Sequence, residues 1–169
     1  MAATQAVLTL VKSGQRVVVS DNVYGGTHRL FTKILAGYGV EFAFLDATDP
    51  GAFEKEAGRF DLLWIETPTN PLMEICDIRA LGEVARRQGA VFAVDNTFMS
   101  PYFQKPIALG TDIVVHSTTK YLNGHSDVVG GAVAVRDPEL LAGVRQWRTL
   151  VGAIPGPMEA WLVHRGLAT

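Results

Sequence analysis

One lysine ends an apolar stretch at the point where small, hydroxyl-bearing residues begin. Residues 114–120 read VVHSTTK, so that Lys120 follows a β-branched run and three hydroxyl side chains. An amine in that position can attack a carbonyl group to form a Schiff base, or it can carry a proton. A lysine at the exposed end of a strand is also common and chemically inert. This run by itself is more typical of the inert lysine, so a catalytic role for Lys120 depends on which other residues lie near it.

Polar and aromatic side chains follow three other apolar runs of the chain. Asp21 and Tyr24 come after the first run, residues 66–70 (ETPTN) after a second, and residues 95–97 (DNT) after a third. A carboxylate at the end of an apolar strand, an aromatic ring and hydroxyl groups can together hold an organic cofactor. The elements that carry these residues decide whether they meet the lysine.

Short apolar runs alternate with segments of helical period along the chain. Asp77 and Asp137-Pro138 have the composition of helix starts, and Gly14 that of a helix end. The predicted helices cover residues 2–12, 28–38 and 77–88, with a further helix from residue 137; the predicted strands are residues 15–20, 41–45, 60–65, 90–94, 112–116 and 130–135.

This alternation predicts an α/β fold with three layers, in which helices cover both faces of a mostly parallel sheet. Ligands of such sheets bind beyond the carboxyl ends of the strands. The polar residues described above follow four different predicted strands at that edge. We therefore expect Tyr24, residues 66–70, residues 95–97 and Lys120 to converge.

The composition is that of an ordinary globular protein. The chain has 169 residues, of which 48% are hydrophobic and 19% charged, and a net charge of -2. That charge gives no attraction to nucleic acid or to an anionic membrane. Cys76 is the single cysteine, so that no internal disulfide and no zinc or other metal site is expected. No stretch approaches the roughly 20 apolar residues of a membrane span, and no signal peptide is visible. We expect a cytoplasmic protein.

The residues at the strand ends favour one cofactor over the common nucleotides. The sequence has no Gly-x-Gly-x-x-Gly after its first strand and no Gly-x-x-x-x-Gly-Lys, so that dinucleotide and triphosphate binding have no motif. A lysine, a carboxylate, hydroxyl groups and an aromatic ring remain. Pyridoxal phosphate uses this set: an amine for its aldehyde, a carboxylate for its ring nitrogen, hydroxyls for its phosphate and an aromatic face for its ring.

Four motifs resemble a known family along essentially the whole chain. They occur, in this order, at residues 21–27 (DNVYGGT), 66–71 (ETPTNP), 93–98 (AVDNTF) and 116–127 (HSTTKYLNGHSD). Together they resemble the cysteine/methionine-metabolism group of pyridoxal-phosphate-dependent enzymes, typified by cystathionine γ-synthase and cystathionine γ-lyase. The resemblance implies that the chain folds as the large cofactor-binding domain of fold-type I pyridoxal-phosphate enzymes.

The resemblance implies roles for the principal residues. Lys120 matches the Schiff-base lysine and is the catalytic amine. Asp95 matches the carboxylate that keeps the pyridine nitrogen protonated, and Tyr24 the catalytic residue that stacks on the ring. Ser117 and Thr119 match ligands of the cofactor phosphate.

Other residues are assigned to the same site with alternatives left open. Asn70 matches an asparagine near the cofactor hydroxyl and the substrate carboxylate, although its loop, with Pro68 and Pro71, could simply be a rigid turn. Thr97 is expected to orient Asp95. Glu66 is expected only to brace its loop, and His116 to be a packed structural histidine.

The N-terminal residues match only part of a family turn. Met1 aligns with the methionine of a Ser-Gly-Met-Ala-Ala turn whose amides contribute to the phosphate site, and the Ser-Gly half is missing from the sequence. Family members are roughly twice as long. We therefore expect residues 1–169 to be a partial large domain without the N-terminal arm and the C-terminal domain.

The resemblance implies C–S bond chemistry on sulfur amino acids in a homotetrameric enzyme. The reaction is expected to be γ-elimination or γ-replacement through a Schiff base on Lys120, with a sulfur amino acid or activated homoserine as substrate. Cystathionine β-lyase, methionine γ-lyase and homoserine sulfhydrylase activities remain open alternatives. A further hypothesis is that the 169-residue chain alone is a truncated, non-catalytic fragment or assembly module.

Overall fold

The computed structural model describes residues 1–169 and contains one mixed sheet of six strands. The strands lie in the order β2-β1-β3-β4-β5-β6, and only β6 runs antiparallel to its neighbour. All six predicted strands are present, with shifts of one or two residues at some ends. Their bounds are β1 (Arg16–Ser20), β2 (Glu41–Leu45), β3 (Leu62–Glu66), β4 (Val91–Asp95), β5 (Ile113–Ser117) and β6 (Gly131–Val135).

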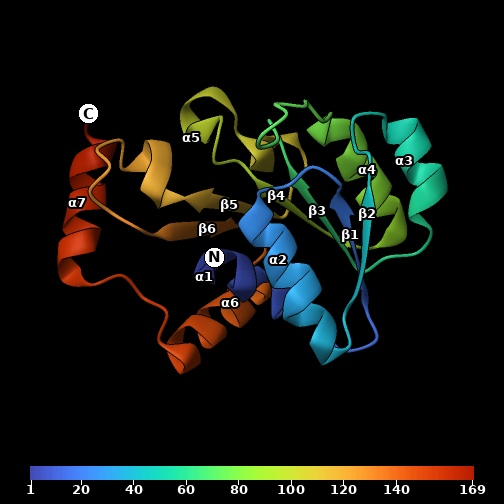
Figure 1. The fold of residues 1–169 in the computed structure, drawn as a ribbon, viewed down its shortest axis with the longest axis horizontal. Coiled ribbons are helices and arrows are strands. Elements are labelled where there is room, and N and C mark those ends of the chain that lie inside the picture. Colours follow the sequence, from blue (N-terminus) through green and yellow to red (C-terminus); the bar gives the residue numbers. More distant parts are fainter.

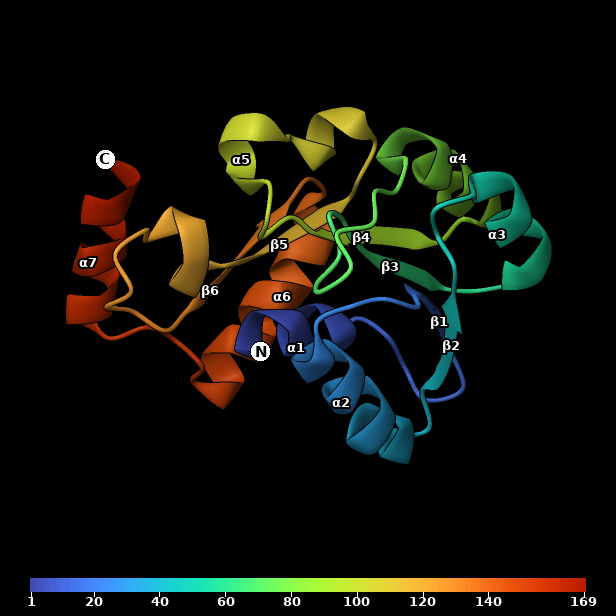
Figure 2. The ribbon, with the colours of Figure 1, turned by 45° about the horizontal axis from the view of Figure 1, so that its top comes forward.

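Helices cover both faces of the sheet, which confirms the predicted three layers (Figures 1 and 2). One face carries α3 (Pro50–Ala57) and α4 (Ile78–Gln88), and the other carries α1 (Ala2–Leu8), α2 (Gly25–Lys33) and α6 (Pro138–Val151).

The central strand β3 shows how its residues divide between the two faces. Leu63 and Ile65 pack in the core under α3 and α4, whereas Leu62 and Trp64 pack in the core under α1 and α2. The alternation follows from the period of two in a strand. Because both faces are covered, all five residues of β3 are buried.

Two aspartates begin helices as the sequence predicted. The Asp77 carboxylate accepts a hydrogen bond from the amide of Ala80 at 3.0 Å, and Asp137 caps α6 in the same manner. These bonds satisfy amides that have no partner inside the helix. A third cap, Asp49, starts α3, a helix that the sequence analysis did not predict.

The first predicted helix is shorter than expected. It was predicted to reach residue 12, but α1 ends at Leu8, and two turns follow in which the amides of Leu10 and Val11 bond three residues back. Leu10 and Val11 still pack against the core. Their apolar spacing, which suggested a longer helix, therefore belongs to turns that place both side chains on the same face.

The second predicted helix, residues 28–38, was also wrong in its bounds. It begins earlier, at Gly25, and ends at Lys33, after which a 3-10 turn follows as η1 (Leu35–Tyr38). Gly37 and Gly39 weaken helix propensity there, and Gly39 ends the turn with a φ of 83°, which suits glycine. Gly25 and Gly26, which precede the predicted start, form the first turn of α2.

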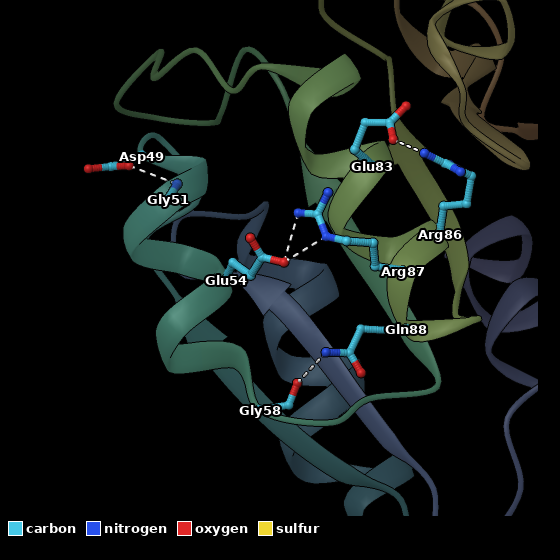
Figure 3. A network of polar contacts seen from close by, with 8 residues as sticks. All are labelled: Asp49, Gly51, Glu54, Gly58, Glu83, Arg86, Arg87 and Gln88. Atoms are coloured by element: carbon cyan, nitrogen blue, oxygen red, sulfur yellow. Dashed lines mark hydrogen bonds and ion pairs between the residues drawn. The ribbon is translucent and has the colours of Figure 1, made fainter.

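Polar contacts tie α3 to α4 on the outer surface of the molecule (Figure 3). The Arg87 guanidinium contacts the Glu54 carboxylate at 2.7 Å, and the Gln88 amide donates to the Gly58 carbonyl at 3.2 Å. Arg86 and Glu83 form a further pair within α4. Exposed ion pairs of this kind typically contribute about 1 kcal/mol or less, so the apolar contacts beneath them dominate the stability of this layer.

Short turns and a C-terminal helix complete the chain. The turns are α5 (Ser100–Phe103), η2 (Pro106–Leu109) and η3 (Thr118–Leu122), the last following β5 directly. The last helix, α7 (Pro157–Leu167), stands at one end of the molecule beside η3 (Figures 1 and 2). None of the helices combines the length and apolar character needed to cross a lipid bilayer.

Candidate active site

The predicted site residues lie where parallel strands end. The last residues of β3 and β4, Glu66 and Asp95, are direct neighbours in the sheet register, and Asp95 also pairs with Val115 of β5. Side chains of paired residues on parallel strands point to the same face. The two carboxyl groups therefore share one face at the carboxyl edge of the sheet.

Thr97 joins Asp95 to the end of the neighbouring strand. Its hydroxyl and its amide both donate to Asp95 Oδ1, at 2.5 and 3.0 Å, and the hydroxyl oxygen accepts from the amide of Ser117 at 2.8 Å. Thr97 therefore contacts Asp95 directly, as its expected orienting role requires. Desolvation raises the pKa of Asp95, and the two bonds from Thr97 and the charge of the chain amine lower it in part.

Glu66 has more contacts than a loop brace would need. Its side chain is only 5% exposed, and its Oε2 accepts from the amide of Tyr24 at 2.7 Å. The amide of Asn70 also bonds to this carboxyl. Burial, followed by the charge of Asp95, raises the pKa of Glu66 to about 8. The contact with Asn70 agrees with the expected bracing of the loop, and the contact with Tyr24 adds a link to the segment before α2; a carboxylate that directly ends a buried central strand is the sequence signal for such a residue.

Tyr24 and Met1 lie together beside this edge. Tyr24 is the residue before α2, and its side chain is about half exposed. A β-carbon at Gly26 would lie 2.4 Å from Tyr24 Cε1 and 3.1 Å from Met1 Sδ, so only glycine leaves the ring in this place. The structure thus brings both residues to one corner of the sheet.

The loop after β3 places Asn70 at the same edge. Asn70 is partly buried, and Thr69 before it accepts from the side-chain amide of Asn22 at 3.0 Å. Glu74, farther along, accepts from the same Asn22 amide at 3.0 Å. The peptide bonds before Pro68 and Pro71 are cis. The loop after β1 and the loop after β3 are therefore held to one another.

Lys120 lies in an irregular turn that we call the lysine loop, residues 118–130. Its side chain is exposed, and its backbone, with φ -94° and ψ -123°, interrupts the helical turn η3. Thr118 donates its amide to the Gly130 carbonyl at 3.0 Å. The Thr119 hydroxyl accepts from the Gly130 amide at 2.9 Å and donates to the Gly130 carbonyl at 3.3 Å. Gly130 thus closes the loop around the lysine.

The two predicted phosphate ligands differ in their surroundings. Ser117, at the end of β5, is partly exposed, and its hydroxyl has no partner within the chain. The Thr119 hydroxyl is already bonded to Gly130. Ser117 is therefore the freer of the two for an added ligand.

Helix α7 supports the far side of the lysine loop. The Arg165 guanidinium contacts the Asp127 carboxylate at 2.7 Å, and Asp127 also accepts from the Asn123 side-chain amide at 2.8 Å. A β-carbon at Gly166 would lie 2.1 Å from the Asn123 carbonyl oxygen, so the helix approaches the loop as closely as glycine permits. His125 contacts the same carbonyl at 2.6 Å. Asn123, His125 and Asp127 thus form contacts that hold the lysine loop and join it to α7.

His116 is a packed residue, as the sequence predicted. It is 8% exposed on β5, and its Nδ1 has no hydrogen-bond partner. Burial lowers the pKa of this imidazole from its ordinary value of 6.5. An uncharged histidine of this kind belongs to the core between β5 and its neighbours.

The residues at this edge fit pyridoxal phosphate. Asp95 is a desolvated carboxylate whose only bonding partner is Thr97, so a protonated ring nitrogen would supply the positive charge that it lacks. Tyr24 offers an aromatic face, Ser117 a free hydroxyl, and Lys120 an accessible amine. A parallel sheet with these groups at its carboxyl edge has the arrangement of a pyridoxal-phosphate-binding domain.

Comparison with known proteins identifies the family. The sequence profile described as "Cys/Met metabolism PLP-dependent enzyme" matches residues 1–169, and the chain belongs to this family. The chain is 46% identical to a probable cystathionine γ-synthase of Herpetosiphon aurantiacus and 46% identical to a cystathionine γ-lyase of Bacillus subtilis, in both cases over 100% of its length. A solved methionine γ-lyase from Micromonospora echinospora matches 98% of the chain with 47% identity and a TM-score of 0.93.

The chain spans about half the length of these relatives. It covers 53% of the Herpetosiphon protein, 45% of the Bacillus protein and 45% of the Micromonospora structure. The family and its pyridoxal-phosphate cofactor are thus established for the matched region, and the fold agrees with that of the solved relative over nearly all of it.

Proposed function

We propose that the protein carrying this chain cleaves or forms C–S bonds of sulfur amino acids, with cystathionine γ-lyase or γ-synthase chemistry. The observation that carries the proposal is the position of Lys120 directly after β5, next to the strand end at which Thr97 links Asp95 to Ser117. The names of the matched relatives support the class of substrate.

The chain's own residues would hold the cofactor. Asp95 would face the ring nitrogen with its negative charge, and Tyr24 would cover one side of the ring. Ser117, Thr119 and Met1 would contribute to the phosphate site. When bound, pyridoxal phosphate supplies an electron-withdrawing ring that accepts the electron pair left on a substrate carbon.

Lys120 would bind the cofactor and then move protons. Its side chain is exposed at the edge of the sheet, and as a free amine it would take a proton from the α-carbon of the substrate. Asn70, on the loop after β3, would orient the substrate carboxylate by its side-chain amide. Thr97 would act indirectly, since its hydroxyl fixes Asp95.

Product analysis with cystathionine tests the proposal and separates the related activities. Cleavage on the γ side consumes water and gives cysteine, 2-oxobutyrate and ammonia, and cleavage on the β side gives homocysteine, pyruvate and ammonia. We expect the γ products, or cystathionine formation from cysteine and an activated homoserine. β products would favour a β-lyase, activity on methionine alone a methionine γ-lyase, and use of sulfide with homoserine esters a sulfhydrylase. No turnover of any of these would refute the proposal.

We also propose that the protein works as a homotetramer in the cytoplasm. Large apolar side chains are exposed on the C-terminal helices, with Leu150 at 78% and Trp161 at 59%, and surfaces of this kind are typical of interfaces. The single cysteine, Cys76, is buried and unpaired, as is common in a reducing compartment. Sedimentation of the purified protein tests the assembly: a monomer at all concentrations would contradict it.

A further inference from the structure

Glu66 is the only acidic residue among the buried residues of the chain. Its carboxyl receives the amide of Tyr24, which begins the segment leading into α2, and the amide of Asn70 in the loop after β3. Its own amide donates to the Ser20 hydroxyl of β1 at 3.2 Å. The Glu66 side chain thus fixes the main chain on both sides of the site, at Tyr24 and at Asn70.

The surroundings of Glu66 contain no compensating positive charge. The ionisable group that acts on it is Asp95 on β4, its neighbour in the sheet register, and it takes part in none of the ion pairs of the chain. Two carboxylates that share one face of a sheet cannot both ionise without mutual repulsion. The proposed function places the protonated ring nitrogen opposite Asp95, and Thr97 donates two hydrogen bonds to this carboxylate, so the negative charge is better placed on Asp95 than on Glu66.

We propose that Glu66 is a positioning residue of the cofactor site that works as an uncharged acid. It holds Tyr24 and Asn70 by their amides and leaves Asp95 as the single charged carboxylate at this edge of the sheet. The proposal rests on the function proposed above, and it deepens that function by naming the group that holds the ring-covering tyrosine in place.

Glu74 provides a matched comparison within the same region. Its carboxylate also links the loops after β1 and β3, through the side-chain amide of Asn22 at 3.0 Å. It is less buried than Glu66 and does not contact Tyr24. If linking the two loops were the whole role of Glu66, loss of either carboxylate would have similar consequences.

The first test measures unfolding of the cofactor-free protein against pH. The pKa of Glu66 rises from 4.5 to about 8 on folding, so the folded state binds the extra proton and stability due to Glu66 falls as the pH increases through this range. Glu66→Gln keeps an acceptor oxygen without a titratable group. We expect this variant to gain stability over the wild type progressively between those two pH values, and Glu74→Gln to run parallel to the wild type.

The second test reads the position of Tyr24 through the bound cofactor. Glu66→Leu removes the acceptor, and we expect the affinity for pyridoxal phosphate to fall about tenfold and the induced circular dichroism of the bound cofactor to decrease. Glu66→Gln should restore both signals at neutral pH, whereas a role that requires a charged Glu66 predicts no rescue.

The outcomes separate this inference from the proposed function. If the wild type binds no pyridoxal phosphate, the proposed function fails, and the unfolding curves still report whether Glu66 is neutral. If the wild type binds it but Glu66→Gln behaves as Glu66→Leu does, or its unfolding curve parallels that of the wild type, the positioning role as an uncharged acid is refuted.

Discussion

The ends of strands β3 and β4, which carry Glu66 and Asp95, and the lysine loop are neighbours, but different elements of structure hold them in place. Glu66 and Asp95 end two adjacent central strands, and the sheet register fixes their relative position. Lys120 lies in an exposed turn with an irregular backbone, closed by bonds to Gly130 and supported from outside by α7. The two carboxyl groups are thus held by the rigid sheet, whereas the amine that we propose to be reactive is held by a loop.

This difference fits the tasks that we propose for the two regions. A carboxylate that must stabilise charge acts best when it is already oriented and partly desolvated. An amine that must bind a cofactor, leave it and then move protons needs access to solvent and room to change position. Changes in the first region should therefore alter electrostatics with the fold intact, and changes in the second should alter reactivity.

Removal of the amine should have the largest effect. We expect Lys120→Ala to lower the turnover rate by roughly 10³-fold or more with little change in stability, because the side chain is exposed and removal of a nucleophile or proton carrier abolishes its step. Steady-state kinetics and thermal unfolding measure the two effects. Lys55→Ala, at an exposed position on α3, serves as the control; equal losses in both variants would remove Lys120 from the mechanism.

Neutralising Asp95 should separate activity from stability. Asp95→Asn removes the charge opposite the ring nitrogen, and we expect the turnover rate to fall roughly 10²-fold. Because burial raises the pKa of Asp95 in the folded state, the ionised form is the less stable one, and the variant should be at least as stable as the wild type near pH 7. Marked destabilisation of the variant at that pH would show that the charge has a structural role instead.

A methyl group between α7 and the lysine loop should weaken their contact. Gly166→Ala places a β-carbon 2.1 Å from the Asn123 carbonyl oxygen, and we expect a loss of about 1–3 kcal/mol in unfolding free energy together with slower turnover. Denaturant unfolding measures the loss of stability, and steady-state kinetics measure the turnover rate. Gly37→Ala, where nothing lies within 4 Å, is the matched control and should cost little. Unchanged kinetics in Gly166→Ala would mean that α7 does not position the loop.

Loss of the Thr97 hydroxyl should have the smallest effect of these changes. Thr97→Val removes the bond to Asp95 at 2.5 Å and leaves the Ser117 amide without its acceptor, so we expect a loss of about 1–2 kcal/mol in stability and a modest decrease in cofactor affinity. Thr97→Ser keeps the hydroxyl and should retain most of both. If the serine variant is as impaired as the valine variant, the methyl group of Thr97 matters and not its bond to Asp95.

The sequence sufficed for the sheet and for the principal residues of its carboxyl edge. Strands such as Glu41–Leu45 are short apolar runs between turns, and the caps at Asp77 and Asp137 are local signals, so these were predicted correctly. Parallel strands end at one edge of a sheet, so Asp95 and the turn that carries Lys120 were predicted to follow strands of the same sheet, and these strands, β4 and β5, are neighbours.

Features that depend on packing were beyond the sequence. The end of α1 at Leu8 was missed because Leu10 and Val11 continue the apolar pattern in a turn. The close approach of Gly166 to Asn123 joins residues far apart in the chain. Glu66 looked like a loop residue because its burial and its pairing with Asp95 arise only when β3 and β4 lie side by side.

The most direct test of the central claim is to find which amine binds the cofactor. Borohydride reduction of the purified protein with pyridoxal phosphate fixes the cofactor covalently to the amine that has condensed with it, and peptide mapping then locates the product. We predict one modified peptide, with the cofactor on Lys120. Modification of a different lysine, or none at all, would contradict the claim; the other lysines of the chain are Lys12, Lys33, Lys55 and Lys105.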